Sequence, residues 1–338
     1  MVIKENISLK PYNTFGIDVS TRVFAELFSE EDILSFLSSS QSYPKPFLFL
    51  GGGSNLLFTQ HFSGTVVKIS TKGMRVMKEG GNEVFVTAAS GENWDDLVKF
   101  TVENGWGGLE NLSLIPGSVG ASPIQNIGAY GVEVKDSIEQ VEAIELLSFE
   151  RRVFSSKECA FGYRDSIFKG ELRDRYLILN VTFKLHSSPA LKLDYGSIQE
   201  EISKAGITSP SAGDVREAVC TIRRSKLPDP NVTGNAGSFF KNPVIPIEQF
   251  RSLKVRFPQM GSFPSGDEVK LAAAWLIEQC GWKGKHQGNA GVHEKQPLVL
   301  INCGGATGKE IMQLSNEIIK SVKEKFGVML EREVNCII

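Results

Sequence analysis

The stretch that most limits how this chain can fold is Leu114–Gly131, which reads LIPGSVGASPIQNIGAYG. It contains four glycines and two prolines and carries no charged residue. Glycine and proline both disfavour a helix, and a long loop is uncommon in a compact domain unless it has a function. Its neutral polar groups and accessible backbone suit close contact with a large ligand. The sequence favours a ligand-binding loop over a purely structural one.

Two further glycine clusters resemble phosphate-binding loops. Gly51–Asn55 (GGGSN) follows the apolar segment FLFL, and it either presents backbone N–H groups to an anion or simply ends a strand. Leu56 stands where a dinucleotide-binding G-x-G-x-x-G pattern requires glycine. Gly304–Glu310 (GGATGKE) lacks the P-loop spacing and has Glu310 where Ser or Thr would hold magnesium. We interpret it as the start of a helix with a capping box.

Composition limits the class of protein. A chain of 338 residues predicts two or three domains. A net charge of −2 gives no basic field for nucleic acid, and no apolar run approaches the roughly 18–20 residues of a membrane span. The polar start predicts no signal peptide, and five scattered cysteines without a CxxC pair fit a reducing compartment. The four histidines form no HExxH motif, so we expect no metal site.

Periodicity predicts an α+β protein without regular βαβ alternation. Predicted strands occupy Val23–Phe28, Phe47–Leu50, Thr65–Ser70, Glu83–Ser90, Ile138–Leu147, Arg175–Leu185 and Val328–Ile338. Predicted helices occupy Asn93–Gly105, Asp214–Ser225, Glu268–Cys280 and Thr307–Phe326. The Pro- and Gly-rich stretch Leu227–Gly237 is the best candidate for a domain boundary.

Seven segments in collinear order resemble the UDP-N-acetylenolpyruvoylglucosamine reductase family, the flavoenzymes of the second committed step of peptidoglycan precursor synthesis. Three of them are the most specific. They are the Gly108–Val134 segment, which contains Leu114–Gly131 (the glycine block), FGYRDS (Phe161–Ser166) and GNAGSFFKNP (Gly234–Pro243). The remaining four are NTFG (Asn13–Gly16), LGGGSNLLF (Leu50–Phe58), KLAAAWLIEQC (Lys270–Cys280) and VHEKQPLVLIN (Val292–Asn302).

The resemblance implies a vanillyl-alcohol-oxidase-type FAD-binding region of two α+β subdomains and a separate α+β substrate domain. The corresponding boundaries are residues 1–70 (joined by strand 328–338), 71–225 and 226–327. It also implies bound FAD, NADPH as cosubstrate and UDP-N-acetylglucosamine enolpyruvate as substrate. The residues it assigns to FAD are Gly51, Gly52, Gly53, Ser54, Asn55, Pro116, Gly117, Ser118, Gly120, Ala121, Ser122, Gln125, Asn126, Gly128, Ala129, Tyr130 and Gly131.

The implied reaction delivers a hydride to the terminal carbon of the enolpyruvyl double bond, so negative charge builds up at the carboxylate. Arg164 suits that charge because a guanidinium is a planar, permanent cation, although a structural ion pair with Asp165 is the alternative. Strand alternation places Glu331 and Glu333 on one face and cannot choose between them, whereas the family motif selects Glu333 as the second catalytic group. Ser238 is expected to donate the proton, because AGSFF lacks the GxSxG elbow and neighbouring base of a nucleophilic serine.

The resemblance also implies substrate contacts, and surface charge is the alternative for each lysine among them. These contacts are Tyr163, Tyr195, Lys226, Asn242, Lys283 and Gln296. Tyr195 matches the mobile tyrosine loop of the longer subclass. Phe263 departs from the pattern, because a substrate-contacting tyrosine is expected near that position.

Three other functions are weaker alternatives. A flavin oxidase of the same fold would not need the charge-stabilising set, and a carrier protein would not retain Arg164, Ser238 and Glu333 together. A serine hydrolase lacks its base. We therefore expect a cytoplasmic, monomeric reductase that neither binds nucleic acid nor inserts into a membrane.

Overall fold

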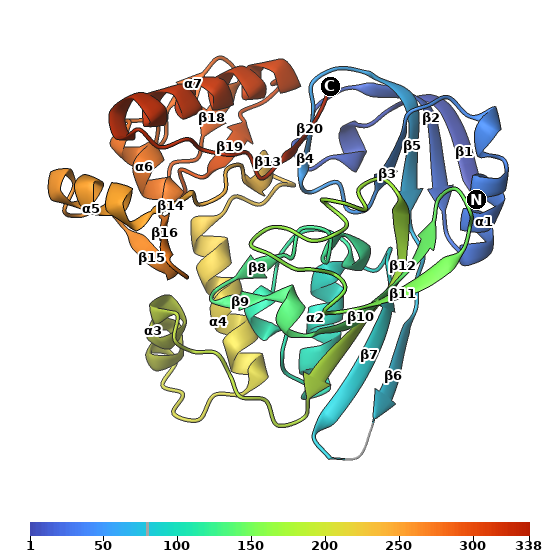
Figure 1. Ribbon diagram of the computed structural model, residues 1–338, viewed down its shortest axis with the longest axis horizontal. Helices are drawn as coiled ribbons and strands as arrows, with labels where there is room; N and C mark the ends of the chain where they lie inside the picture. Colours follow the sequence, from blue (N-terminus) through green and yellow to red (C-terminus); the bar gives the residue numbers. More distant parts are fainter. Residues whose placement is uncertain (79–80) are drawn as a thin grey trace. The chain divides into compact units, whose positions relative to one another are not determined.

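The computed structural model describes residues 1–78 and 81–338 (Figure 1). The chain forms two compact units. Unit 1 comprises Met1–Ile7, Thr21–Gly52 and Ser63–Ser225, and unit 2 comprises Ser8–Ser20, Gly53–Phe62 and Lys226–Ile338. Strands and helices occur in both, which confirms the α+β class.

Unit 1 contains two main sheets. The first has the order β1-β2-β5-β3 and the second, antiparallel throughout, has the order β11-β10-β12-β7-β6. Their bounds are β1 Val2–Ser8, β2 Ser20–Leu27, β3 Phe47–Leu50, β5 Phe62–Ile69, β6 Met74–Lys78, β7 Glu83–Ala89, β10 Ile138–Glu145, β11 Arg151–Ser155 and β12 Tyr176–His186. Helix α1 (Glu30–Ser38) packs Ile33, Phe36 and Leu37 into a core with residues of both sheets.

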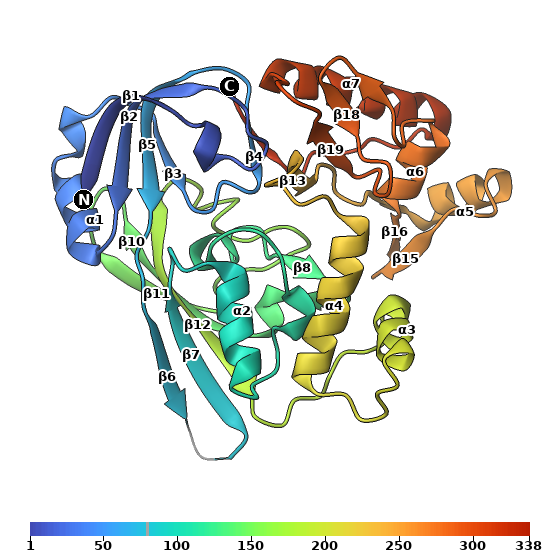
Figure 2. The same ribbon diagram turned by 180° about the vertical axis from the view of Figure 1, so that it is seen from behind.

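Helix α2 (Trp94–Glu103) and the glycine block share the other core of unit 1. Asn93 caps α2, and Trp94, Leu97 and Val98 are buried. The glycine block contains η4 (Val119–Ala121) and leads into the small β8–β9 hairpin (Gly128–Ala129 and Val132–Glu133). Helices α3 (Gly196–Lys204) and α4 (Ala212–Lys226) form a third cluster with Tyr130. Figures 1 and 2 both show α2 and α4 on opposite sides of β8 and β9.

Unit 2 holds a four-stranded sheet of order β13-β19-β18-β17 and a three-stranded sheet of order β14-β16-β15. Strand β20 pairs in parallel with β4. The bounds are β4 Leu56–Phe58, β13 Gly234–Ser238, β14 Val244–Pro246, α5 Ile247–Arg256, β15 Ser262–Ser265, β16 Glu268–Leu271, α6 Ala273–Gln279, β17 His286–Gln287, β18 Ala290–Val292, β19 Val299–Asn302, α7 Gly308–Phe326 and β20 Asn335–Ile337.

Helix α7 confirms the interpretation of the third glycine cluster. Thr307 and Glu310 form the capping box, and Gly327 ends the helix in the left-handed conformation at φ +67°. Ile311, Leu314, Ile318 and Val322 form a stripe of buried side chains along one face of the helix.

Two predicted elements are wrong in unit 2. The segment Glu268–Cys280 is not one helix, because β16 pairs with β14 and β15 before α6 begins at Ala273. Its first residues alternate in burial, with Val269 and Leu271 inside, a pattern that the abundance of helix formers conceals. The predicted strand Val328–Ile338 shrinks to Asn335–Ile337 plus one bridge between Phe240 and Arg332.

Candidate active site

In unit 1 the first two glycine clusters meet. A Cβ atom added to Gly52 would lie 2.8 Å from Gly117 Cα, and one added to Gly51 would lie 2.2 Å from Ser118 Oγ. The Gly52 contact is with backbone and leaves room only for glycine, whereas a side chain at Gly51 would have to displace the Ser118 hydroxyl. The clusters are far apart in sequence, yet their backbones form one cradle, which favours the ligand-binding interpretation of both.

Arg164 lies against the second half of the glycine block. It sits in a tight turn, where Gly162 and Asp165 exchange backbone hydrogen bonds, and has φ +55°. Its Nη2 donates to the Gly128 carbonyl at 2.7 Å. A left-handed arginine is uncommon, and such residues concentrate at functional sites. The turn thereby fixes a guanidinium against the glycine block.

Asn126 joins the same turn to the block with its own side chain. Its Nδ2 donates to the Gly162 carbonyl at 2.8 Å and to Glu133 Oε2 at 2.9 Å, while its Oδ1 accepts from Lys135 N–H at 3.1 Å. The amide of Asn126 thus has both of its donors and its oxygen engaged within the protein, and the Ser122 hydroxyl uses its donor on the Val119 carbonyl.

Tyr130 and Tyr195, which the sequence assigns to different ligands, pack edge to face with ring centroids 5.3 Å apart. Tyr195 is 45% exposed and directly precedes α3. Burial raises the pKa of the Tyr130 phenol, which the nearby Arg223 guanidinium opposes. Arg223 comes from α4, and burial lowers the pKa of its guanidinium. No motif in the sequence singles out Arg223.

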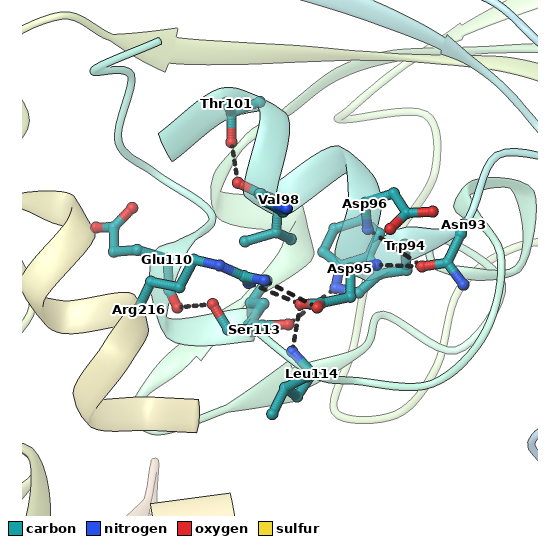
Figure 3. Close-up of polar contacts among 12 residues, drawn as sticks. Asn93, Trp94, Asp95, Asp96, Val98, Thr101, Glu110, Ser113, Leu114 and Arg216 are labelled. Atoms are coloured by element: carbon teal, nitrogen blue, oxygen red, sulfur yellow. Dashed lines mark hydrogen bonds and ion pairs between the residues drawn. The ribbon is translucent and has the colours of Figure 1, made fainter. Parts of the chain in front are cut away.

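Asp95 holds the start of the block (Figure 3). Its Oδ1 accepts from the Leu114 N–H at 2.6 Å, and its two oxygens accept from Arg216 of α4 at 2.7 and 2.9 Å. Burial opposes ionisation of this carboxylate, but the hydrogen bonds from Arg216 and Leu114 outweigh it, so the pKa of Asp95 is lowered. Sequence patterns gave no reason to single out this pair.

The remaining part of the Gly51–Asn55 cluster belongs to unit 2. Gly53 has φ +65°, and a Cβ there would lie 2.1 Å from the Tyr12 carbonyl. Asn55 Nδ2 donates to the Glu333 carbonyl at 3.2 Å, and the Asn55 carbonyl accepts from the Asn335 N–H at 3.1 Å. This predicted cofactor segment is thus bonded to the C-terminal segment of the chain.

Ser238 ends β13 at an irregularity in its pairing with β19. Gly237 has φ +67°, and its N–H donates to Asn235 Oδ1 at 2.9 Å. Within residues 1–78 and 81–338, no group accepts a hydrogen bond from the Ser238 hydroxyl. A nucleophilic serine would need such a base, so the arrangement argues against a hydrolase.

The C-terminal segment pairs with the residues just after Ser238. Glu333 N–H donates to the Phe239 carbonyl at 2.8 Å, and Lys241 N–H donates to the Glu331 carbonyl at 2.9 Å. Glu331 is an exposed partner of Lys241, with Nζ and Oε2 3.0 Å apart. Glu333 is half-buried. The two glutamates, which strand alternation places on one face, therefore differ in exposure in the structure.

The predicted substrate residues are distributed over both units. In unit 1, Tyr163 lies in the Arg164 turn, with its ring centroid 5.4 Å from the guanidinium carbon. In unit 2, Asn242 Oδ1 accepts from the Ala273 N–H at 2.9 Å, so it caps α6. Lys283 pairs with Glu278 at 2.7 Å. The other positions are Lys226 at the end of α4, half-buried Gln296 before β19, and Phe263, which is 48% exposed in β15.

The residues of unit 1 fit the cofactor that the resemblance implies. FAD needs backbone that can approach a pyrophosphate and polar groups around its ring. The glycine cradle supplies the first. In the described part of the chain, Arg223 Nε and Asn111 Oδ1 are buried without a hydrogen-bond partner, which leaves polar atoms for a ligand to satisfy.

Two further findings concern metal ions and membranes. Among the described residues, no group of three or more His, Cys, Asp or Glu side chains is placed to hold a metal ion. Every helix in residues 1–78 and 81–338 is too short or too polar to cross a membrane.

Comparison with known proteins identifies the class first. Residues 21–147 match the FAD binding domain family, which covers the Gly51–Asn55 cluster and the glycine block. With the α+β fold, this match defines an FAD-dependent oxidoreductase.

The particular family follows from the rest of the chain. Residues 229–337 match the UDP-N-acetylenolpyruvoylglucosamine reductase C-terminal domain. The reductase of that name from Chromobacterium violaceum is 50% identical over 98% of this chain and 97% of its own, and that of Flavobacterium johnsoniae is 46% identical over 100% of both. A solved structure of the Thermus caldophilus reductase, 22% identical, shares the fold with a TM-score of 0.67 over 99% of both chains. The chain belongs to the UDP-N-acetylenolpyruvoylglucosamine reductase family.

Proposed function

We propose that Arg164, Ser238 and Glu333 are the catalytic residues with which this chain reduces UDP-N-acetylglucosamine enolpyruvate to UDP-N-acetylmuramate. The observation that carries the proposal is the placement of Ser238. Its hydroxyl ends a bulged strand, has no base among the described residues, and follows a glycine at φ +67° that sets its direction.

The chemistry that FAD supplies when bound is hydride transfer, from NADPH to the terminal carbon of the enolpyruvyl group. The electron pair of the double bond then moves toward the carbon that bears the carboxylate. That carbon is strongly basic, so a hydroxyl as weakly acidic as that of Ser238 can protonate it. The serine oxygen that remains must regain a proton before the next turnover.

Arg164 binds the carboxylate on which negative charge grows. Its Nη2 donates to the Gly128 carbonyl at 2.7 Å and its Nη1 to the Asn126 carbonyl at 3.5 Å, and these bonds fix the plane of the guanidinium. A planar guanidinium can pair with both oxygens of a carboxylate. Glu333 acts from the segment paired with Phe239, and its backbone position is fixed by that pairing. A glutamate there favours a growing anion only when it carries a proton or is hydrogen-bonded.

The remaining assignments are substrate contacts. Tyr163, Lys226, Asn242, Lys283 and Gln296 bind the nucleotide part. Tyr195 belongs to a movable tyrosine loop of the longer subclass, and its exposure against Tyr130 supports a residue that can leave this position. Because Asn242 Oδ1 already caps α6, its Nδ2 is the group left for a substrate.

The proposed architecture keeps the boundaries of the sequence analysis, with FAD subdomains at 1–70 plus 328–338 and at 71–225, and a substrate domain at 226–327. The pairing of β20 with β4 supports assigning the C-terminal strand to the first subdomain. We further propose that the enzyme works as a monomer in the cytoplasm.

Measuring NADPH oxidation by the purified FAD-loaded protein tests this function. Consumption should require UDP-N-acetylglucosamine enolpyruvate, and the product should be UDP-N-acetylmuramate. Equally fast oxidation with oxygen alone would support the flavin oxidase instead. A colourless protein that cannot be reconstituted with FAD would refute both.

A further inference from the structure

Leu114 occupies a strained position at the entrance to the glycine block. It has φ +56°, although a branched residue rarely adopts the left-handed region. Pro116 follows two residues later and starts the part of the block assigned to FAD. The strain must therefore be stabilised by a neighbour, because a relaxed Leu114 would redirect every residue after it.

The first turn of α2 provides that neighbour. Asp95 accepts the Leu114 N–H at 2.6 Å, and Trp94 Nε1 donates to the Leu112 carbonyl at 2.9 Å. The backbone N–H of Trp94 also donates to the Gly117 carbonyl at 3.1 Å. Of these contacts, only the one to Asp95 is charged and reaches the strained residue itself, as Figure 3 shows.

Arg216 orients the Asp95 carboxylate. It approaches with two N–H groups at 2.7 and 2.9 Å, and both side chains are largely buried, 15% and 23% exposed. A bidentate ion pair of this kind has a more defined geometry than an exposed ion pair at the surface. Because Asp95 Oδ1 serves Arg216 and Leu114 together, the position of α4 is transmitted to the Leu114 backbone.

Helix α4 also reaches the other end of the block. Arg223, two helical turns after Arg216 on the same face, interacts with the Tyr130 hydroxyl. One helix thus contacts the block near residue 114 and at residue 130. Contacts at both ends indicate that α4 sets the path of the glycine block and does not only add stability.

We propose that Asp95 and Arg216 are positioning residues for the cofactor: their ion pair holds Leu114 in its left-handed conformation and thereby sets the path of the FAD-binding block. Neither residue is proposed to touch FAD. The inference rests on the assignment of Pro116–Gly131 to FAD in the proposed function.

Asp96 offers a matched control. It lies in the same first turn of α2, its N–H shares the Asn93 cap, and its side chain is exposed. Asp95→Ala and Asp96→Ala therefore remove the same charge from the same helix end, but only the first removes the acceptor of Leu114. Asp95→Asn retains one oxygen for Leu114 and weakens the contact with Arg216.

The test is FAD titration of the apoproteins together with the visible spectrum of the bound flavin. Asp95→Ala should bind FAD about tenfold more weakly with a shifted spectrum, Asp95→Asn should fall between it and wild type, and Asp96→Ala should match wild type. Wild-type affinity and spectrum in Asp95→Ala would overturn the proposal. The ion pair would then be only a structural link between α2 and α4. If Asp95→Ala does not fold, Asp95→Asn against Asp96→Asn decides in the same way.

Amide hydrogen exchange of the apoproteins separates this inference from the cofactor assignment. Exchange across residues 114–131 should be faster in Asp95→Ala than in Asp96→Ala, and equal exchange would contradict the positioning role. Failure of the wild type to bind FAD would refute the cofactor assignment, while the exchange comparison would still decide whether Asp95 orders the block.

Discussion

The glycine block Leu114–Gly131 and the Ser238 segment Gly234–Pro243 are both glycine-rich and irregular, yet they are held in different ways. Side chains hold much of the block: Asp95 at its start, and Asn126 and Arg164 in its second half. Backbone pairing holds most of the Ser238 segment, through β19 on one side and the residues around Arg332 on the other, and Asn235 Oδ1 adds one side-chain bond to the Gly237 N–H.

This difference separates positioning from chemistry. A loop held by side chains changes its path when one of those side chains is replaced, so substitutions around the block should alter cofactor binding. A segment held by its backbone keeps its path when a side chain is replaced. Substitutions at Ser238 or Glu333 should therefore remove chemistry and leave the local structure intact.

The largest effect is expected for Ser238→Ala. Oxidation of the reduced enzyme by substrate should slow by about 10²–10⁴-fold, because proton delivery is lost, while flavin reduction by NADPH stays near wild type. Stopped-flow measurement of the two half-reactions checks this, and Ser238→Cys should restore part of the rate. Equal slowing of both half-reactions would show that the segment moved, and the contrast with the block would fail.

The next effect compares two glutamates of one segment. Glu333→Gln should slow the substrate half-reaction by about 10–10³-fold, the range expected when one charge-stabilising group is lost. Glu331→Gln breaks only the exposed pair with Lys241, so its rate should stay within about twofold of wild type. Similar losses in both variants would contradict the assignment to Glu333.

A smaller effect is expected in the cradle. Gly52→Ala places a methyl group against Gly117 Cα, which should cost about 1–3 kcal/mol of stability and weaken FAD binding. Gly196→Ala is the control, because a Cβ there meets nothing within 4 Å. Thermal unfolding and FAD titration of both variants give the comparison. Unchanged FAD affinity in Gly52→Ala would mean that the cradle can relax without disturbing the cofactor.

The smallest effect tests a turn whose residues are assigned to no ligand and which the Glu145 side chain holds. The Glu145 carboxylate accepts from the Ser148 N–H, the Arg175 Nε–H and the Leu147 N–H, and these contacts lower its pKa from 4.5 to about 2. Because the folded pKa lies below the unfolded one, the stabilisation is complete above about pH 4.5 and is lost as pH falls through about 2.

Glu145→Gln should accordingly lower the urea midpoint of unfolding at neutral pH. The difference from wild type should shrink between pH 4.5 and 2, and FAD affinity at neutral pH should not change. A difference that does not depend on pH would show that the carboxylate charge is not what holds the turn. A change in FAD affinity would show that side-chain-held turns influence the cofactor even at a distance.

The sequence predicts elements best where local signals agree. Helix α7 has its capping box, its apolar stripe and its terminal glycine, and all are found. Prediction from the sequence fails where helix-forming composition conflicts with strand-like alternation, as in β16. It also fails where an element depends on a partner distant in the chain. The short strand β20 is defined by β4, and no local pattern marks its bounds.

For the candidate site, the sequence motifs identify the glycine loops but not what orients them. Asp95 and Arg216 are 121 positions apart, and neither stands in a recognisable motif. Their roles depend on the packing of α2 and α4 around the block. Strand alternation cannot choose between Glu331 and Glu333, whereas the family motif favours Glu333. The structure adds that Lys241 pairs with Glu331.

The pairing of β20 with β4 also has a consequence for biogenesis. Asn335 bonds to Asn55 across 280 positions, so the Gly53–Phe58 segment cannot complete its contacts until residues 335–337 leave the ribosome. At about 5–20 residues per second, that segment waits on the order of 15–55 s after its own synthesis. FAD loading is therefore expected only after β20 has been synthesised, and a nascent chain stalled before residue 335 should remain colourless.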